Sequence, residues 1–579
     1  MGSGGLLVRS YDGHNNNVEN PAWGQAGQPL FRLFEHAYSE DGGATLADSE
    51  RPNPRDISNS VFKQEENEES LNIPNELGVS DFFWQWGQFL DHDLDLTPVA
   101  KPRDPADILA TDTTFDPEQT GQFKLRFSRS RFIGGTSSAH PRQQVNIVSS
   151  WIDGSNVYGS DSHRANALRM KDGTGRLKFS TGNLLPKNTQ SLENEKPEYL
   201  PAEDFFLAGD VRANEQVGLT VMHTLFMREH NYQVETCSSL AEAGTMERDE
   251  DLYQCARNRV IAILQKITYD EFLPLLLGSE NLGAYNEYDS SLDGTIRNSF
   301  STASYRFGHS ALSPDLLKVY YEEGHLRSEP LTLKNAFFCH TCVSDDGLEP
   351  YLLGLAYQTH QKVDARVVNE VRNTLFGPTG DLVALNIQRG RDHGIPTYNQ
   401  AREALGGLER VSGFDQISSD AETVTRLQSI YTSVDHVDLW VGALAEDHVT
   451  GGMVGPTNAR ILKEQFKVLR DGDRYWYQNS GNPNPLTFDE MQMVRQTTLT
   501  KVIKRNTRLG DEMPNNAFMA GTLVYPSTTD VAASTAANTQ PTNSPLTQGL
   551  EPSSALSTLM SEVIMTGALL IALYAIGNG

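Results

Sequence analysis

The chain has 579 residues, of which 38% are hydrophobic and 21% are charged, as in a soluble globular protein. Its 48 basic and 75 acidic side chains give a formal net charge of −27. A field of this sign repels phosphate backbones, which argues against a nucleic-acid partner, and it attracts cations such as calcium.

The composition divides the chain into four parts. Residues 1–10 form a short N-terminal tail without an apolar run long enough for a signal peptide, and the steady composition of residues 11–526 predicts one large domain. Residues 527–562 are rich in Ser, Thr and Pro and predict a disordered stalk. The apolar tail 563–579 is shorter than the roughly 20 residues of a spanning helix. We expect a secreted or cell-surface protein, with this tail as a membrane or surface attachment.

Apolar residues inside the domain recur mainly at helical spacing. "LTVMHTLFMREHNYQVE" (219–235) and "LYQCARNRVIAILQKITYDEFLPLLLG" (252–278) each form a broad apolar face, and the second should end within Pro274–Gly278. "AETVTRLQSIYTSVDHVDLWVGALAE" (421–446) and "NARILKEQFKVLRDGDRYWYQ" (458–478) also predict helices. Clear alternating strands are few, so the predicted fold class is mainly α with little β structure.

The chain contains four cysteines: Cys237, Cys255, Cys339 and Cys342. The last two form a lone "CHTC", a pattern typical of a zinc half-site, a redox pair or a tight disulfide. A second CxxC is absent from the sequence, and we favour two disulfides, one within each neighbouring pair. An even number of cysteines is compatible with an oxidising compartment.

The stretch "QWGQFLDHDLDLTP" combines an amide, a histidine and three acids. Gln88 and His92 are four residues apart and share one helix face, whereas Asp91 and Asp93 flank the histidine and point elsewhere. A polar face in solvent is one explanation. The aromatic neighbours "FFWQWGQFL" instead indicate a buried helix, whose polar side chains need partners.

Several further stretches carry groups that suit a cofactor or a cation. In "SSWIDGSNVYGSD", side-chain oxygens alternate with Trp151 in a spacing that suits calcium or an ordinary turn. Arg212 and Glu215 begin a strong helix, where an ion pair or a capping acid is the simpler explanation. His309 follows a glycine in "SYRFGHSAL", and "LNIQRGRDHGIPTYN" carries a polar cluster around Asn386.

Taken together and in this order, these stretches resemble the animal-type haem peroxidases, the superfamily of myeloperoxidase, lactoperoxidase and peroxidasin. "WGQFLDHDLDLTP", "DGSNVYGSD", "MHTLFMREHN" and "LNIQRGRDHGIPTYN" carry the resemblance, which extends from "YDGHNNNVENPAWGQAG" to "VIKRNTR". It implies a large single haem peroxidase domain that binds haem b and calcium. Such an enzyme reduces hydrogen peroxide and oxidises a small donor: a halide, a pseudohalide, a phenol or a tyrosyl group.

The resemblance also implies roles on the distal side of the haem. His92 matches the distal histidine, whose neutral imidazole takes a proton from peroxide and returns it to the leaving oxygen. Arg212 matches the distal arginine, which is always charged, and Gln88 the distal amide. Asp91 and Glu215 match the two acids that form ester bonds to haem.

On the other side of the haem, His309 matches the proximal iron ligand, and Asn386 shares the proton on its second ring nitrogen. Arg306 and Arg389 are expected partners of the haem propionates. The resemblance further implies a calcium site next to the distal helix. Its ligands would be Asp93, Ser149, Trp151 through its carbonyl, Asp153 and Ser155.

One residue departs from the myeloperoxidase pattern. Gln216 occupies the position of a methionine that forms a sulfonium bond to haem, so we expect no such bond here. Bromide, iodide, thiocyanate or organic donors are therefore favoured over chloride.

Two other functions remain open. Fatty-acid dioxygenases share this haem scaffold, but their radical tyrosine lies three residues before the proximal histidine, where this chain has Arg306, with Tyr305 one residue out of register. A matrix or adhesion protein with an inactive peroxidase domain would lose His92, Arg212 or His309, and this sequence retains all three.

Overall fold

The structure is a computed structural model that describes residues 7–522, except 48–49, 67–68, 138, 238–245, 323–324 and 376–379. The predicted stalk 527–562, the apolar tail 563–579 and the first six residues lie outside the described residues. The predicted domain boundaries therefore remain predictions. Among the helices of the described segments, none has the length and apolar character needed to cross a membrane.

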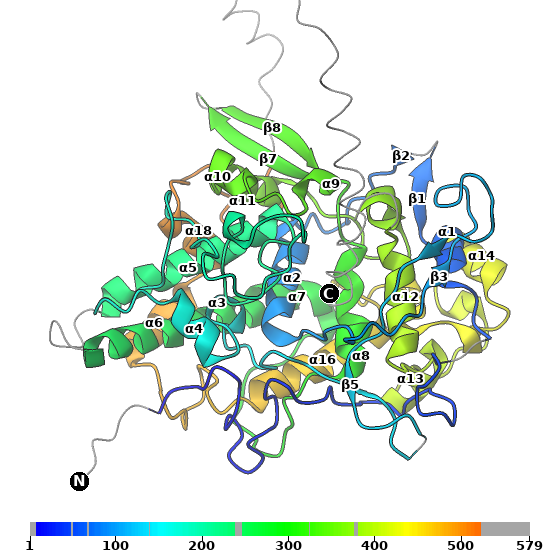
Figure 1. Ribbon diagram of the computed structural model, residues 1–579, viewed down its shortest axis with the longest axis horizontal. Coiled ribbons are helices and arrows are strands. Elements are labelled where there is room, and N and C mark those ends of the chain that lie inside the picture. Colours follow the sequence, from blue (N-terminus) through cyan, green and yellow to red (C-terminus); the bar gives the residue numbers. More distant parts are fainter. Residues whose placement is uncertain are drawn as a thin grey trace, which may run out of the picture.

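Five helices organise the domain, and the predicted mainly α class is confirmed. The longest are α5 (Val217–Cys237), α6 (Met246–Ile267) and α16 (Pro456–Asp471). Helix α2 (Phe82–Leu94) lies near the middle of the molecule, between α5 on one side and α12 (Leu382–Asp392) on the other (Figure 1).

The remaining helices are short. The α-helices are α1 Pro54–Val61, α3 Ser155–Tyr158, α4 Ser162–Leu168, α7 Leu273–Leu277, α8 Asn298–Thr302, α9 Leu333–Ala336, α10 Cys342–Asp346, α11 Glu349–Tyr357, α13 Tyr398–Leu405, α14 Ala421–Ile430, α15 Leu439–Ala445, α17 Phe488–Gln496 and α18 Leu499–Asn506. Two π-helices cover Thr268–Phe272 and Glu370–Thr374. The 3-10 helices are Ala202–Asp204, Gly278–Glu280, Ser304–His309, Phe414–Gln416 and Val434–His436.

Strands contribute little to the described chain. The hairpin of β7 (Asp315–Glu322) and β8 (His325–Thr332) is the longest, pairs Asp315 with Thr332, and lies beside α10 and α11 at the top of Figure 1. A three-stranded sheet has the order β2-β1-β9, in which β1 is antiparallel to β2 and parallel to β9. Two small hairpins pair β3 with β4 and β5 with β6. Their bounds are β1 Lys63–Glu66, β2 Glu69–Ser70, β3 Ile108–Leu109, β4 Lys124–Leu125, β5 Phe132–Ile133, β6 Gln143–Gln144 and β9 Val367–Val368.

Two of the predicted helical segments form continuous helical structure. The stretch 219–235 lies within α5, and 252–278 continues from α6 through a π-helix into α7, which ends at Leu277 with Gly278 as its C-cap. Pro274 does not interrupt this run because it occupies the first turn of α7, where its missing N–H is tolerated.

The prediction of one helix over 421–446 is wrong. The α-helix ends at Ile430, only a short 3-10 helix covers Val434–His436, and the next α-helix begins at Leu439. The cause is long-range: the buried carboxylate of Asp438 accepts hydrogen bonds from Arg51 and Arg391 at 2.7–3.0 Å. A buried ion pair of this kind fixes where the chain must pass, and helical propensity does not outweigh it.

The helix predicted over 458–478 ends seven residues early, at Asp471. Gly472 follows, and the carboxylate of Asp473 then accepts hydrogen bonds from Arg9 at 2.7 Å and from Asn16 at 2.9 Å. These two partners lie more than 450 residues away in the sequence, so local periodicity contains no sign of them.

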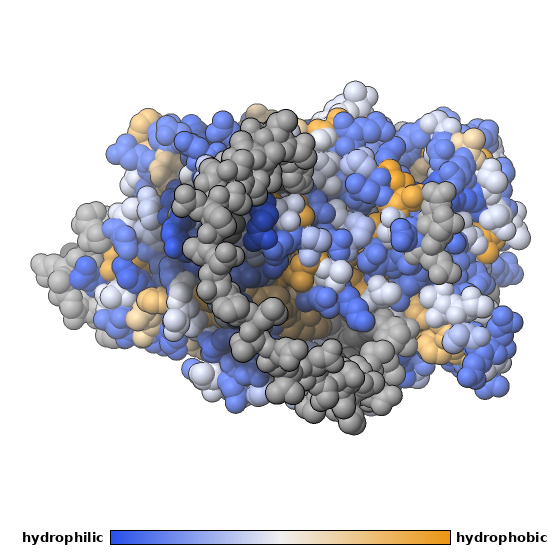
Figure 2. Space-filling view, turned by 90° about the horizontal axis from the view of Figure 1, so that it is seen from above, coloured by the Kyte–Doolittle hydropathy of each residue, from blue (hydrophilic) through white to orange (hydrophobic). Residues whose placement is uncertain are grey.

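Both predicted disulfides are present. Cys237–Cys255 joins the end of α5 to α6, and Cys339–Cys342 closes the turn that leads into the first residue of α10. The described residues contain no free cysteine, which excludes a four-cysteine zinc site. On the face shown in Figure 2, hydrophilic residues dominate and hydrophobic ones are scattered.

Candidate active site

Helix α2 is buried along almost its whole length, as the aromatic sequence predicted. Phe82, Trp86 and Phe89 are fully buried. Phe89 stacks on Phe226 of α5 with 5.1 Å between the ring centroids. At the C-terminal end, the side-chain amide of Asn146 donates to the carbonyl of Leu94 at 2.9 Å. Packing and this hydrogen bond together fix the helix that carries the candidate catalytic residues.

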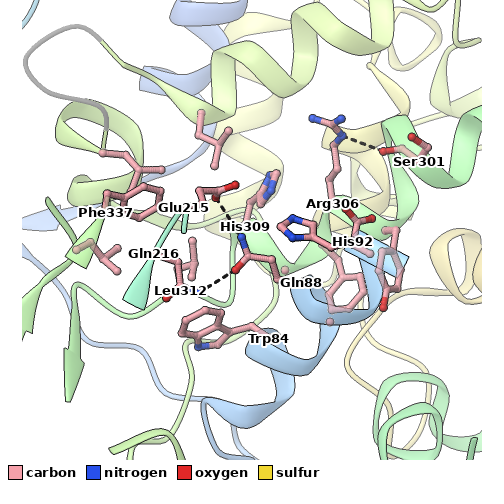
Figure 3. A pocket seen from close by; sticks show the side chains of 18 residues that line it. Trp84, Gln88, His92, Glu215, Gln216, Ser301, Arg306, His309, Leu312 and Phe337 are labelled. Carbon is pink, nitrogen blue, oxygen red and sulfur yellow. Dashed lines mark hydrogen bonds between the residues drawn. The ribbon is translucent and has the colours of Figure 1, made fainter. Parts of the chain in front are cut away.

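A cavity lined by both polar and apolar side chains lies beside α2 (Figure 3). Side chains from α2, from the segment before α5, from the 3-10 helix Ser304–His309 and from the start of α12 line it. The lining residues are Trp84, Gly87, Gln88, Asp91, His92, Glu215, Gln216, Ser301, Tyr305, Arg306, Phe307, Gly308, His309, Leu312, Leu333, Phe337, Leu375 and Leu382. The structure therefore brings together six predicted site residues from three separate stretches: Gln88, Asp91, His92, Glu215, Arg306 and His309.

His92 faces this cavity and is buried, with 2% of its surface exposed. Its Nδ1 atom is buried and has no hydrogen-bond partner among the described residues. The nearest charged atom recorded for it is Oδ1 of Asp210, at 3.7 Å. Burial, followed by the positive charge of Arg212, lowers the pKa of His92 well below its usual value. The imidazole is therefore neutral at physiological pH, as a proton acceptor must be.

An amide network holds Gln88 in place. Its Nε2 donates to Oε1 of Glu215 at 3.1 Å, and its Oε1 accepts from Nε2 of Gln216 at 2.9 Å (Figure 3). Gln216 also donates to Gln85 at 2.7 Å and accepts from the backbone N–H of Gly218 at 2.6 Å. The Gln216 amide is thus held at both its nitrogen and its oxygen, and its nitrogen fixes the orientation of Gln88.

Arg212 lies behind the cavity wall and is fully buried. Its Nε and Nη2 donate to the two carboxylate oxygens of Asp210 at 2.9 Å each, and Nη2 also donates to the carbonyl of Asp95 at 2.9 Å. Nη1 lies 3.9 Å from Oδ2 of Asp91, which lines the cavity. Burial alone would raise the pKa of Asp210, but Arg212 outweighs it and holds that pKa well below its usual value.

His309 approaches the cavity from the end of a 3-10 helix and contacts Asn386. The group of Asn386 that faces the ring is its NH2, a donor, whereas the predicted role has Asn386 accept or share the ring proton. The Nδ1 atom of His309 lies 2.7 Å from the side-chain amide of Asn386 on α12. The Oδ1 atom of Asn386 accepts a hydrogen bond from Arg306 at 3.1 Å. Burial, followed by the charge of Arg306, lowers the pKa of His309 to about 3. A neutral imidazole is the form that binds a metal.

Two acids and one arginine complete the cavity wall. Burial raises the pKa of Glu215 to about 7, and burial together with the neighbouring Asp95 raises that of Asp91 well above its usual value. Arg306 lines the cavity, whereas Arg389 is not among the lining residues. The guanidinium of Arg389 instead donates to the carboxylate of Asp392 at 3.0 Å.

The predicted cation ligands gather at the C-terminal end of α2. The carboxylate of Asp93 accepts from Ser155 at 2.9 Å, and that of Asp153 accepts from Ser149 at 2.7 Å. Burial and mutual repulsion raise the pKa of Asp93 to about 7, and burial raises that of Asp153 to about 6. Within the described chain, no group of three or more His, Cys, Asp or Glu side chains is placed so that it could hold a metal ion. The arrangement offers two carboxylates and two hydroxyls, and these hard oxygen donors suit calcium.

Asp210 is the residue that the sequence analysis missed. It lies two positions before Arg212 in "AGDVRANEQ", is 3% exposed, and contacts Arg212 through both oxygens. An acid so close to an arginine that must be buried was a usable signal, since buried charges are paired.

The fold is that of a mainly α single domain, and its cavity is lined by two histidines, His92 and His309, a set of residues that suits haem. The residues present fit haem: His309 and His92 face the same cavity, and Arg306 on the cavity wall suits the carboxylates of such a cofactor. Comparison with known proteins agrees. Residues 8–518 match the animal haem peroxidase family.

Proteins with similar sequences include a peroxinectin, a lactoperoxidase and a peroxidasin. Peroxinectin A of Dictyostelium discoideum is 35% identical over 530 residues, covering 88% of this chain and 95% of that protein. Lactoperoxidase of Mesocricetus auratus is 34% identical, covering 88% and 77% respectively. The human peroxidasin homolog is 33% identical, but the chain spans only 36% of its length.

Solved structures give the same result. Peroxidase A of Dictyostelium discoideum superposes with a TM-score of 0.79 at 32% identity, covering 89% of this chain and all of that one. A fatty acid alpha-dioxygenase of Oryza sativa superposes with a TM-score of 0.71 at 20% identity, covering 89% of this chain and 88% of that one, which shows a shared fold alone. The chain belongs to the animal haem peroxidase family. It is an oxidoreductase that binds haem and uses hydrogen peroxide with a reducing substrate.

The N-terminal end of α2 provides a test of these electrostatics. Asp81 precedes the helix, is fully buried, and burial raises its pKa well above the usual value. As pH rises above 3.8, the unfolded chain ionises this acid while the folded chain keeps it protonated, so folding stability falls. We expect Asp81→Asn to raise the unfolding temperature at pH 7 by on the order of 2 °C, with the gain vanishing near pH 3.

Calorimetry of both proteins from pH 3 to pH 7 measures this difference. Asp172→Asn is the control, because Asp172 is exposed and its hydrogen bond with Thr174 lowers its pKa. The control should give no gain at pH 7. An Asp81→Asn protein less stable than the parent at pH 7 would show that the carboxylate is ionised in the fold.

Proposed function

We propose that this haem peroxidase works through His92, Arg212 and Gln88 on the distal side and His309 on the proximal side. The observation that carries the proposal is that His92 and His309 line one cavity from two separate elements, α2 and the 3-10 helix Ser304–His309. When bound, haem supplies an iron atom that binds peroxide and accepts its two oxidising equivalents.

His92 acts as the proton carrier of the reaction. Its depressed pKa leaves the imidazole free to accept the proton of an incoming peroxide and to return it to the departing oxygen. Arg212 stays charged because its guanidinium is paired with Asp210, and it directs positive charge toward the side of the cavity where negative charge develops. Gln88, fixed by Gln216, positions water or a small donor beside His92.

His309 is proposed to hold the iron, with Asn386 fixing the orientation of its ring. Arg306 is the propionate partner that the cavity lining supports. Arg389 remains a weaker proposal, because its guanidinium already pairs with Asp392.

Asp91 and Glu215 are proposed to form ester bonds to haem b. Both carboxyl groups lie on the cavity wall, and their raised pKa values favour the neutral acid over the carboxylate. Gln216 offers no sulfur, and its amide is occupied by Gln85, Gln88 and Gly218. We therefore propose bromide, iodide, thiocyanate, phenols or tyrosyl groups as donors, rather than chloride.

The fatty-acid dioxygenase is the weaker alternative. Tyr305 lines the cavity, but it stands one residue out of register and Arg306 occupies the expected position of the radical tyrosine. Oxygen uptake with palmitic acid and no peroxide turnover would favour that alternative. An inactive adhesion domain is disfavoured because His92, Arg212 and His309 are not only retained but gathered at one site.

A calcium ion is proposed beside the distal helix, held by Asp93, Asp153, Ser149, Ser155 and the carbonyl of Trp151. Burial raises the pKa of both acids and Asp153 further raises that of Asp93, and a cation between two such carboxylates stabilises their charged forms. Because Asp93 follows His92 directly, the cation would fix the end of α2.

We further propose that the protein acts outside the cytosol, at a cell surface or in a secreted form. Two disulfides support an oxidising compartment. The stalk and apolar tail predicted at 527–579 would supply the membrane attachment.

The proposed haem ligand is tested by His309→Ala, which should lose most of the bound haem and of the guaiacol and bromide turnover. His92→Leu should keep haem and lose peroxide turnover by about 100-fold or more. Haem content, from the Soret absorbance per protein, separates the two effects. His448→Ala is the control, because His448 is outside the cavity and bonds the carbonyl of Val363. Full activity of His309→Ala would contradict the assignment of His309 as the haem ligand.

The calcium proposal predicts one calcium per chain after exhaustive dialysis. Asp93→Asn should lose the ion and lower the unfolding temperature, because the substitution removes one of the two carboxylates of the calcium site. Elemental analysis of the purified proteins measures the content. Asp161→Asn is the matched control, since Asp161 lies near the same loop but only caps α4. Equal calcium in the parent and Asp93→Asn would contradict the proposal.

A further inference from the structure

Asp210 contacts both distal groups from outside the cavity. Its Oδ1 accepts from the backbone N–H of Arg212 at 2.8 Å and from Nε at 2.9 Å, and its Oδ2 accepts from Nη2 at 2.9 Å. The same Oδ1 lies 3.7 Å from Nδ1 of His92. Asp210 itself does not line the cavity, so any part it plays is exerted through these two neighbours.

The two ring nitrogens of His92 lie in different surroundings. Nδ1 is buried, and the described residues give it no hydrogen-bond partner. Nε2 is not among the buried atoms without partners, and His92 lines the cavity, so Nε2 is the nitrogen accessible from it. A neutral imidazole carries its hydrogen on one nitrogen and a lone pair on the other.

An anion fixed beside one nitrogen decides between these two tautomers. The carboxylate is too far away for a normal hydrogen bond, but in a buried setting a negative charge at 3.7 Å strongly favours a hydrogen on the nitrogen that faces it. With the hydrogen on Nδ1, the lone pair is on Nε2 and points to the cavity. That is the tautomer able to accept a proton from a bound peroxide.

We propose that Asp210 is a positioning residue for peroxide activation, which fixes the Nδ1–H tautomer of His92 and holds the guanidinium of Arg212. This inference rests on the proposed roles of His92 and Arg212. It assigns one carboxylate to two tasks: its charge selects the tautomer, and its two oxygens lock the arginine in a bidentate geometry.

The other acids near Arg212 do not reach His92. Asp91 lies on the cavity side of Arg212, at 3.9 Å from Nη1, and the backbone carbonyl of Asp95 accepts from Nη2. Neither carboxylate is within ion-pair distance of His92. Asp210 is therefore the acid that contacts both distal groups in the described chain.

Asp249 provides a matched control for the possibility that Asp210 has a merely structural role. Asp249 is also buried, accepts from the guanidinium of Arg169 at 2.7 Å, and accepts from the backbone N–H groups of Gly173 and Gly175. It contacts no residue of the cavity wall. Asp249→Asn therefore removes the same kind of ion pair without touching the site.

The kinetic test compares Asp210→Asn, Asp249→Asn and His92→Gln as haem-loaded proteins. Stopped-flow absorbance gives the rate constant of the ferric protein with hydrogen peroxide, and separately the rate at which guaiacol reduces the oxidised protein. We expect Asp210→Asn to slow the peroxide step by about 10- to 100-fold, with the guaiacol step within twofold of the parent. Asp249→Asn should leave both steps unchanged.

A second measurement does not depend on any variant of Asp210 folding. In the diamagnetic ferrous carbon monoxide form of the parent protein, ¹⁵N-labelled histidine reports which ring nitrogen carries hydrogen, and His92→Gln identifies the His92 signals. The proposal expects hydrogen on Nδ1. Hydrogen on Nε2 would overturn it, as would a peroxide step in Asp210→Asn within twofold of the parent, or an equal slowing in Asp249→Asn.

The same set of proteins separates this inference from the proposed function. If His92→Gln leaves the peroxide step unchanged, the role of His92 itself is wrong. If His92→Gln loses the step while Asp210→Asn retains it, only the role of Asp210 is wrong.

Discussion

Burial of the polar residues of α2 is the constraint on which the rest of the site depends. The helix is held in the core by Phe82, Trp86 and Phe89, so His92 and Asp93 are carried out of water with it. Each buried polar group then needs a partner or a ligand. Gln88 accepts a hydrogen bond from the amide of Gln216, and Asp93 accepts one from the hydroxyl of Ser155. The haem cavity and the proposed calcium site are therefore two consequences of one buried helix.

Charge pairing determines the charge state of the groups around this helix. The protein carries a net charge of −27, yet the proposed distal side contains the fully buried cation of Arg212. Asp210 stabilises that cation, and the same cation lowers the pKa of His92. The pairing thus keeps the arginine charged and the histidine neutral, and general acid–base and electrostatic catalysis require this combination of states.

Residue patterns predicted the parts of the structure that depend on local sequence. The helical spacing of 219–235 gave α5, and the stretches containing His92 and His309 supplied residues that meet in one cavity. Long-range pairing decided what the patterns missed. Asp438 breaks a predicted helix because Arg51, nearly 400 residues away, binds it.

The partner of Arg212 was missed for a different reason. Asp210 was visible in the sequence, but its importance follows from burial, which no local pattern reveals. Arg389 shows the reverse case: the resemblance assigns it to the haem, whereas the structure pairs it with Asp392. Sequence patterns identify candidate groups, and burial decides which of them share a site.

The most direct test of this account is an optical spectrum of the purified protein loaded with haem, before and after hydrogen peroxide is added without a donor. A haem held by His309 beneath a working distal side should show a Soret band that shifts within seconds of peroxide addition and returns when guaiacol is supplied. A bound haem whose Soret band does not shift when peroxide is added would contradict the assignment of His92 and Arg212. A protein that binds no haem would contradict the cavity assignment itself.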